Sequence, residues 1–218
     1  MSTHTDEGTA ARRRGGARPD KRRAILDAAL LVFARDGFAD ASVDEIARDA
    51  GVAKPTVYNH FGDKRTLFLE VITEYAARSG ERVSRIVDSI DVDTDDLRAE
   101  LERLGASIVA CVTDAEGAAV IRLQFAESPR FGDAVDSVRD AGRDRTLDRL
   151  AGKFGQFAAT GRLHTDNPAR AARHFMALVQ DEVLTRSAYG ARPIDPAEAV
   201  GPVNAGVDTF LAAFGPRG

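Results

Sequence analysis

Several hydrogen-bonding side chains share the outward face of a short segment, residues 54–61. Val57 and Phe61 are four residues apart, so they lie together on the opposite, inward side of a helix. The outward residues are Lys54, Thr56, Asn59 and His60. Ammonium, hydroxyl, amide and imidazole groups donate hydrogen bonds to phosphate oxygens or to base edges. The pattern therefore indicates a surface that contacts a nucleic acid.

A second short helix is predicted just before this segment. Ser42 and Glu45 have the spacing of a capping box, in which each side chain bonds the backbone N–H of the other residue. Val43, Ile46, Ala47 and Ala50 then fall on one face, as in an amphipathic helix of about two turns. Gly51 follows the last apolar residue, where it can adopt the left-handed conformation that ends a helix.

The two segments together have the layout of a helix-turn-helix DNA reader. Pro55 lies in the first turn of the second helix, where its missing N–H costs little. A short turn containing glycine lets the second helix enter a major groove about 12 Å wide. Capped helical hairpins also occur in other all-α proteins, so this layout alone leaves both interpretations open.

A basic segment precedes the first helix. Residues 12–23 carry seven positive charges and one negative charge, and Gly15, Gly16 and Pro19 favour an unfolded arm. Such arms bind phosphates or enter the minor groove, although a solvated tail with no specific role has the same composition.

Charge is distributed unevenly along the 218 residues. Residues 11–65 have a net charge of +4, residues 66–218 have −6, and the whole chain has −4. Only the N-terminal part is therefore suited to contact DNA.

The run from Ala24 to Phe68 resembles the N-terminal domain of the TetR family of transcriptional regulators. The resemblance covers about the first third of the chain and rests on many spaced positions. The matching residues are Phe33, Gly37, Phe38, Ser42, Ile46, Ala47, Ala50, Gly51, Val52, Thr56, Val57, Tyr58, His60, Phe61, Lys64, Leu67 and Phe68.

The resemblance implies a role for each DNA-binding candidate. Residues that match phosphate contacts are Thr56, Tyr58, His60 and Lys64, and residues that match positions over base edges are Lys54, Pro55 and Asn59. Asn59 can pair with adenine and Lys54 with guanine, and the Pro55 ring can touch a thymine methyl. We also place Ser42, Arg22 and Arg23 at the DNA surface. Tyr58 could instead be a core aromatic, as we expect of Phe61.

The rest of the chain predicts an all-α body. Asp63 can cap a long helix that reaches about Arg82. Further helices are expected over residues 97–113, 115–127 and 134–160, then from Asn167 and Pro168, and finally from Asp195 and Pro196, with Pro202 kinking or starting the last one. We divide the chain into a disordered basic arm (1–19), a helix-turn-helix domain (20–66) and an effector-binding and dimerisation domain (67–218).

The body is loosely similar to the ligand-binding and dimerisation domains of the same family. This similarity implies a homodimer whose last two helices form a bundle between subunits, on a palindromic operator. We interpret the apolar stripe on residues 171–183 as part of that interface rather than as an intramolecular core, because a two-fold operator needs a two-fold protein.

The effector is a small molecule that the sequence does not identify. Candidate pocket residues are Leu104, Ile108, Phe125, Phe131 and Phe175, with Arg122, Gln124 and Glu127 as possible polar contacts. The same apolar residues would also fill an ordinary bundle core. The absence of tryptophan argues against an aromatic cage for cations.

Enzyme motifs are missing, since there is no GxSxG, GxGxxG or HExxH pattern. We expect no cofactor and no metal, because His164 and His174 have no third ligand nearby. The longest apolar run, residues 28–34, is too short for a membrane span, and the polar N-terminus predicts a cytoplasmic protein.

The sequence thus predicts a DNA-binding repressor that is released by a small effector. The alternative is a helix-turn-helix regulator controlled by a protein partner or by oxidation of Cys111. We interpret this single cysteine as a buried apolar side chain rather than a redox sensor.

Overall fold

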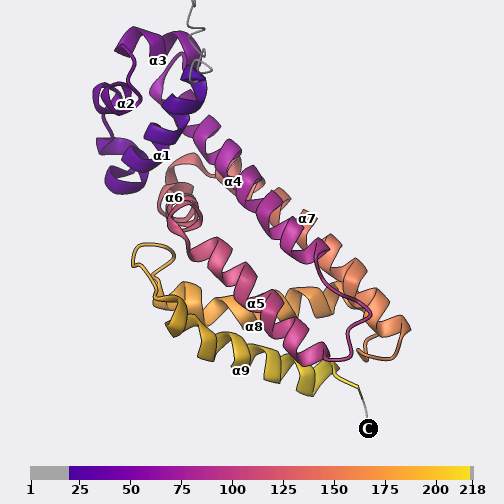
Figure 1. The fold of residues 1–218 in the computed structure, drawn as a ribbon. Helices are drawn as coiled ribbons and strands as arrows, with labels where there is room; N and C mark the ends of the chain where they lie inside the picture. Colours follow the sequence, from indigo (N-terminus) through magenta and orange to yellow (C-terminus); the bar gives the residue numbers. More distant parts are fainter. Residues whose placement is uncertain (1–19, 217–218) are drawn as a thin grey trace, which may run out of the picture.

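The computed structural model describes residues 20–216, and every regular element in this range is an α-helix (Figure 1). In chain order they are α1 (Lys21–Asp40), α2 (Val43–Asp49), α3 (Lys54–Phe61), α4 (Lys64–Asp88), α5 (Leu97–Thr113), α6 (Ala115–Phe131), α7 (Asp133–Ala159), α8 (Pro168–Arg186) and α9 (Pro196–Phe214). The all-α prediction is confirmed. We call α1 to α3 the head and the remaining helices the body.

Helix α1 begins earlier than the sequence suggested. Asp20 accepts a hydrogen bond from the Arg22 N–H and caps the helix, so residues 21–23 are helical and not part of an unfolded arm. The predicted arm over residues 1–19 lies outside the described residues. Near its other end α1 is kinked at Gly37, whose φ of 73° is in the left-handed region that favours glycine.

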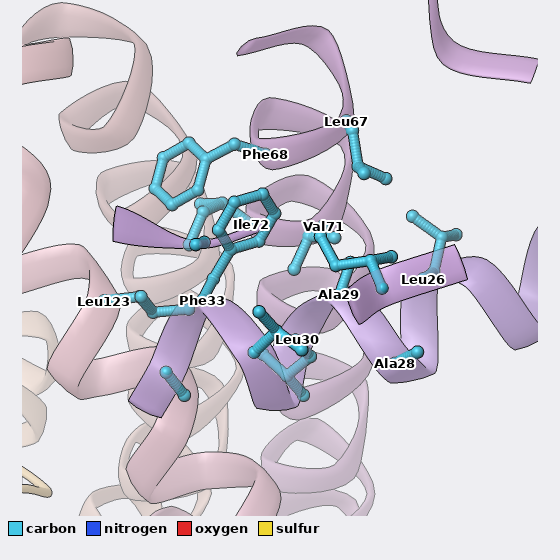
Figure 2. Close-up of a cluster of buried hydrophobic side chains, with 14 of the residues drawn as sticks. Leu26, Ala28, Ala29, Leu30, Phe33, Leu67, Phe68, Val71, Ile72 and Leu123 are labelled. Atoms are coloured by element: carbon cyan, nitrogen blue, oxygen red, sulfur yellow. The ribbon is translucent and has the colours of Figure 1, made fainter. Parts of the chain in front are cut away.

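The head does not have a core of its own. Its apolar residues form one cluster with the first half of α4 and with part of α6 (Figure 2). Phe33 of α1 and Phe68 of α4 are fully buried and meet edge to face, while Leu123 of α6 packs from the body side. This cluster crosses the predicted domain boundary between residues 66 and 67. A displacement of α4 or α6 therefore also displaces the head residues that pack against them.

Helix α4 connects the head to the body, where it lies beside α7 (Figure 1). Asp63 caps it through the Thr66 N–H, as expected. The helix continues to Asp88 rather than ending near Arg82, because Val83 and Val87 lie one turn apart and are buried in a second cluster in the body.

Helix α6 is also longer than expected. It continues past Glu127 through Pro129 to Phe131. Phe131 is buried, and its ring contacts the rings of Phe38 and Phe68. This contact holds the last turn in place despite the proline.

The apolar stripe of α8 belongs to the interior of a single chain. Its buried residues are Ala171, Ala172, Phe175, Val179 and Val183. Phe175 meets the rings of Phe154 from α7 and Phe210 from α9. Our preference for this stripe as the dimer surface was therefore wrong, because packing against α7 and α9 already covers it. Pro202 does not start α9 but lies buried inside it.

Candidate DNA-binding face and ligand cavity

The helix-turn-helix geometry is formed as predicted. Val43, Ile46 and Ala47 bury one side of α2, and the Val52 N–H bonds the Ala47 carbonyl across the turn. Gly51 has a φ of 66°, so the turn uses the left-handed conformation that glycine permits. Val57 and Phe61 are buried under α3, which leaves the opposite side of α3 at the surface.

The predicted capping box of α2 is absent. Ser42 is the N-cap residue, but its side chain makes no cap hydrogen bond. Glu45 instead forms ion pairs with Arg35 at 2.8 Å and Arg48 at 3.0 Å. These two arginines compete for the Glu45 carboxylate, which therefore does not bond the Ser42 backbone N–H. The hydroxyl of this half-buried serine is then available at the edge of the DNA face.

The outer face of α3 presents the predicted DNA-binding groups. Thr56 is half-buried, whereas the other predicted residues of the helix are exposed, namely Lys54, Pro55, Tyr58, Asn59 and His60. Tyr58 is 41% exposed, which is too much for a core aromatic. The structure therefore brings these groups onto one accessible face, and their individual DNA contacts stay predictions.

Lys54 is held by an acidic neighbour in this structure. Its Nζ lies 2.9 Å from the Oδ2 of Asp44, which is in the first turn of α2. The hydrogen bond to Asp44 raises the pKa of Lys54, so its ammonium stays charged. In the predicted base contact, Lys54 would exchange Asp44 for a guanine, so Asp44 would compete with the DNA for the ammonium.

Lys64, the first residue of α4, contacts the end of α1. Its Nζ donates to the Ala39 carbonyl at 2.9 Å and lies 5.0 Å from the centroid of the Phe38 ring. The ammonium is thus anchored at the end of α1, close to the kink at Gly37. The predicted phosphate contact of Lys64 would therefore depend on the position of α1.

Arg22 and Arg23 lie at the start of α1 and are paired with acidic groups. The Arg22 guanidinium is 2.6 Å from Glu70, and the Arg23 Nε is 2.9 Å from Asp27. These pairs tie α1 to α4 and to itself. Both side chains are about half exposed, so a DNA contact by either one stays a prediction.

A cavity of about 510 Å³ lies in the body between α4, α6, α7 and α8. Ala76, Ser79 and Val83 of α4 form one wall, and Val120 and Gln124 of α6 form another. Polar wall residues from α7 and α8 are Arg139, Arg143, Thr146, Arg173, Gln180 and Asp181. Its volume falls within the range of cavities that enclose a small organic ligand.

The five apolar residues predicted for the effector pocket are not on this wall. Leu104, Ile108 and Phe175 fill the second core cluster. Phe131 belongs to the first cluster, and Phe125 is 48% exposed and contacts the Tyr189 ring. Among the polar candidates, Gln124 does line the cavity.

The sequence did contain one signal for the cavity. Arg139 and Arg143 are four residues apart on α7, and Arg173 and Gln180 are seven residues apart on α8, so each pair lies on one helix face. These polar groups therefore lie on helix faces that also carry apolar residues, which is unusual for a closed core.

Family comparisons cover both parts of the chain. Residues 25–71 match the model described as bacterial regulatory proteins of the tetR family, and residues 99–216 match the model described as the AefR-like transcriptional repressor, C-terminal domain. The chain belongs to the TetR family of transcriptional regulators. Its first-third resemblance is thereby confirmed and extended to the body.

TetR-family relatives of this chain include both repressors and activators. The chain is 28% identical over 182 residues to the HTH-type transcriptional repressor AcnR of Corynebacterium efficiens, an alignment that covers 79% of this chain and 84% of AcnR. It is 31% identical over 158 residues to the HTH-type transcriptional activator FasR of Mycolicibacterium smegmatis, which covers 69% of each chain.

A solved TetR-family structure shares the whole fold. The crystal structure of a TetR-family regulator from Mesorhizobium loti has a TM-score of 0.79 and 28% identity, and the alignment covers 89% of this chain and 96% of that chain. The chain is thus a DNA-binding regulator of a family whose members are regulators and not enzymes.

No single helix within residues 20–216 of this chain is both long and apolar enough to cross a membrane. Only α5 and α6 taken together reach that length and composition, and they meet at an angle of 69°.

Proposed function

We propose that this protein is a repressor that binds a palindromic operator as a homodimer and leaves it when a small molecule enters the body. The observation that carries the proposal is the continuity of α6. This helix contributes Val120 and Gln124 to the cavity wall, and one turn later Glu127 bonds the head. A ligand in the cavity therefore touches the element that holds the DNA-reading helices.

Helix α6 is also fixed to α4 at its beginning. Arg82 of α4 pairs with Asp114, the N-cap of α6, and Arg78 lies 3.2 Å from Glu116. Because α4 also lines the cavity, an effector that separates its walls displaces α4 and α6 together. We propose that this displacement tilts α4 and changes the separation of the two heads. A coupling of about 1–3 kcal/mol is enough for such a switch.

The homodimer is proposed through the outward faces of α8 and α9. With the inner stripe of α8 buried in the chain, the surface that is left on α9 carries small side chains, including Gly201 and Ala205, next to Val200, which is 54% exposed. A Cβ on Gly201 would meet open space within one chain. Small residues allow a partner helix to approach closely, and the two α3 helices would then be separated by about 34–36 Å on the DNA.

The dimer surface can be tested without touching the core. Substitution of Ala205 by Arg places a charge on this face, and sedimentation should shift the protein from dimer to monomer at micromolar concentration. The control is Ala141→Arg at an exposed alanine of α7, a helix outside the proposed interface. A dimer that persists in Ala205→Arg would contradict the proposed interface.

Selection of random duplex DNA on the purified protein at physiological salt tests the function as a whole. We expect enrichment of a palindrome whose half-sites are one helical turn apart. No enrichment, even after the protein has been refolded to remove any copurified ligand, would overturn the operator proposal. We place the protein in the cytoplasm, where an operator is accessible.

A further inference from the structure

The cavity is elongated along α8. Its wall on this helix extends from Arg173 to Leu184, which corresponds to about 16 Å at 1.5 Å per residue. The Leu184 end lies beside α6, because the ring of Tyr189 just beyond α8 is 4.5 Å from the ring of Phe125. Gln124 is therefore near one end of the cavity and Arg173 is at the other.

Much of the cavity wall is apolar. This part of the wall is formed by aliphatic side chains from four helices, among them Val83, Val120, Val138, Leu147 and Met176. A ligand must therefore present an apolar body to this part of the wall. Aromatic rings are absent from the wall residues that the described chain provides, which disfavours a quaternary ammonium ligand.

Gln124 is a polar group without a partner. It is 7% exposed, it lines the cavity, and its side-chain amide makes no hydrogen bond to any residue in the described range. Thr146, on the same wall, is different, because its hydroxyl bonds the Gly142 carbonyl at 3.2 Å. Because this amide opens on the cavity, a bound molecule with a hydroxyl or carbonyl group can give it a hydrogen bond there.

The charges on the wall are mainly positive, with three arginines and one aspartate, Asp181. Arg139 forms an ion pair with Asp136 of the same helix, at 2.9 Å. Arg143, whose side chain is 64% exposed at the mouth of the cavity, has acidic neighbours only at 3.8 and 4.0 Å, and the exposed Arg173 forms no ion pair with the described residues. The last two guanidiniums are thus suited to bind a carboxylate, which arginine recognises with two parallel hydrogen bonds.

We propose that the cavity binds an apolar carboxylate, with its anionic group at Arg143 and Arg173 and a hydroxyl or carbonyl at its other end bonded to Gln124. This inference rests on the proposed function, since it assigns the chemical class of the effector. It does not depend on the operator, because binding is measured on the protein alone.

The first experiment compares head groups on one apolar body. Calorimetric titration of the full chain with decanoate, decanol and decylammonium, each below its micelle concentration, should show tightest binding for decanoate. We expect the double variant Arg143→Gln/Arg173→Gln to weaken decanoate binding by about 10- to 100-fold and to leave decanol unchanged. Asp181→Asn should strengthen decanoate binding, because it removes a negative charge that repels the carboxylate of the ligand.

A matched control separates the cavity from general attraction to positive charge. Arg170 lies one turn before Arg173 on the same helix but pairs with Asp166 outside the cavity wall. Arg170→Gln should bind decanoate like the unmodified chain. Equal losses in Arg170→Gln and in the double variant, or equal binding of all three head groups, would overturn the proposal.

A second series tests Gln124. We expect at least one of ω-hydroxyoctanoate, ω-hydroxydecanoate and ω-hydroxydodecanoate to bind more tightly than its parent acid, and Gln124→Leu to abolish that gain while it keeps the affinity for the parent. A gain at no chain length, or one that survives in Gln124→Leu, would overturn the role of Gln124. If the carboxylates bind as expected but the selected operator is not released, the ligand class stands and the switch fails.

Discussion

The Oε1 atom of Glu127 accepts a hydrogen bond from the Phe38 backbone N–H at 2.8 Å, which joins α6 of the body to α1 of the head. Glu127 is 8% exposed, so water does not replace this bond easily. The kink at Gly37 points the N–H toward the carboxylate, and a Cβ at Gly37 would lie 3.2 Å from the same oxygen. The head is therefore attached to α6 by a polar contact within an otherwise apolar interface.

Glu127→Ala should destabilise the head and weaken its response to ligand. The variant leaves the half-buried Phe38 N–H without its protein acceptor, which costs about 1–3 kcal/mol in the free energy of unfolding. Urea denaturation measures this loss. The control is Glu182→Ala, which removes an exposed carboxylate paired with Arg186 and should change stability by less than about 1 kcal/mol. Equal stability of the two variants would show that the Glu127 contact is not important.

Asp44→Asn should increase operator affinity several-fold. Asp44 holds Lys54 at 2.9 Å in the free protein and adds a negative charge beside the DNA. The amide keeps the size of the side chain but releases the ammonium. Lys54→Ala should do the opposite, with a roughly tenfold loss of discrimination at one base pair. Binding titrations on the selected operator and on single-base variants measure both effects. Tighter binding by Lys54→Ala would contradict the base-reading role.

Tyr58→Phe and Lys64→Ala should weaken binding to all DNA sequences alike. Each removes a predicted phosphate contact. Loss of the Lys64 charge should also make the slope of log affinity against log salt shallower by about 0.9, whereas loss of the neutral Tyr58 hydroxyl should leave the slope unchanged. Salt titrations on operator and on random DNA test this. A sequence-dependent loss would reassign the residue to base contact. Lys64→Arg should retain most of the affinity, because it keeps the charge near Ala39.

Local signals predicted α2, the turn and α3 of the head accurately. Gly51, Pro55, and the spacing of Val57 and Phe61 each act within one turn of the chain, so they determine α2, the turn and α3 regardless of what packs nearby. The same holds for Asp63 and Asn167, whose side chains cap α4 and α8 as expected.

Errors arose where a distant residue decides the outcome. The capping box at Ser42 fails because Arg35, from another helix, attracts Glu45. The apolar stripe of α8 gave no sign of whether α9 or a second chain would cover it. The cavity likewise depends on how four helices cross, so its wall could not be separated in the sequence from core positions such as Leu104 and Phe175.

Acid should destabilise the body through Glu100. The Arg103 guanidinium, at 2.6 Å, and the Asp91 N–H, at 2.8 Å, bond its buried carboxylate and hold the pKa of Glu100 below its usual value of 4.5. The folded protein therefore favours the charged form. This stability is complete above the pKa of the unfolded chain and is lost as the pH falls through the lower pKa of the folded state.

Glu100→Gln should cost about 1–3 kcal/mol at neutral pH and should flatten the decline in unfolding free energy below pH 4.5. Denaturation with urea over a pH series gives both quantities. The control is Glu102→Gln, which removes a less buried carboxylate of the same helix that lies 3.5 Å from Arg98. If the acid decline of Glu100→Gln matched that of the unmodified chain, another carboxylate would be responsible for it.

Cys111 should be unreactive in the folded protein. It is 4% exposed, and burial raises the pKa of its thiol even though the nearby Arg82 guanidinium opposes that shift. Since the thiolate is the reactive form, iodoacetamide should label the native chain slowly and the urea-unfolded chain quickly.

The same cysteine distinguishes ligand control from redox control. Cys111→Ala should bind the selected operator as the unmodified chain does and should keep its release by decanoate, because the thiol lines neither the DNA face nor the cavity between α4, α6, α7 and α8. Treatment with hydrogen peroxide should leave operator binding unchanged in both proteins. Release of the unmodified chain by peroxide, with Cys111→Ala still bound, would establish oxidation of Cys111 as the switch in place of the cavity.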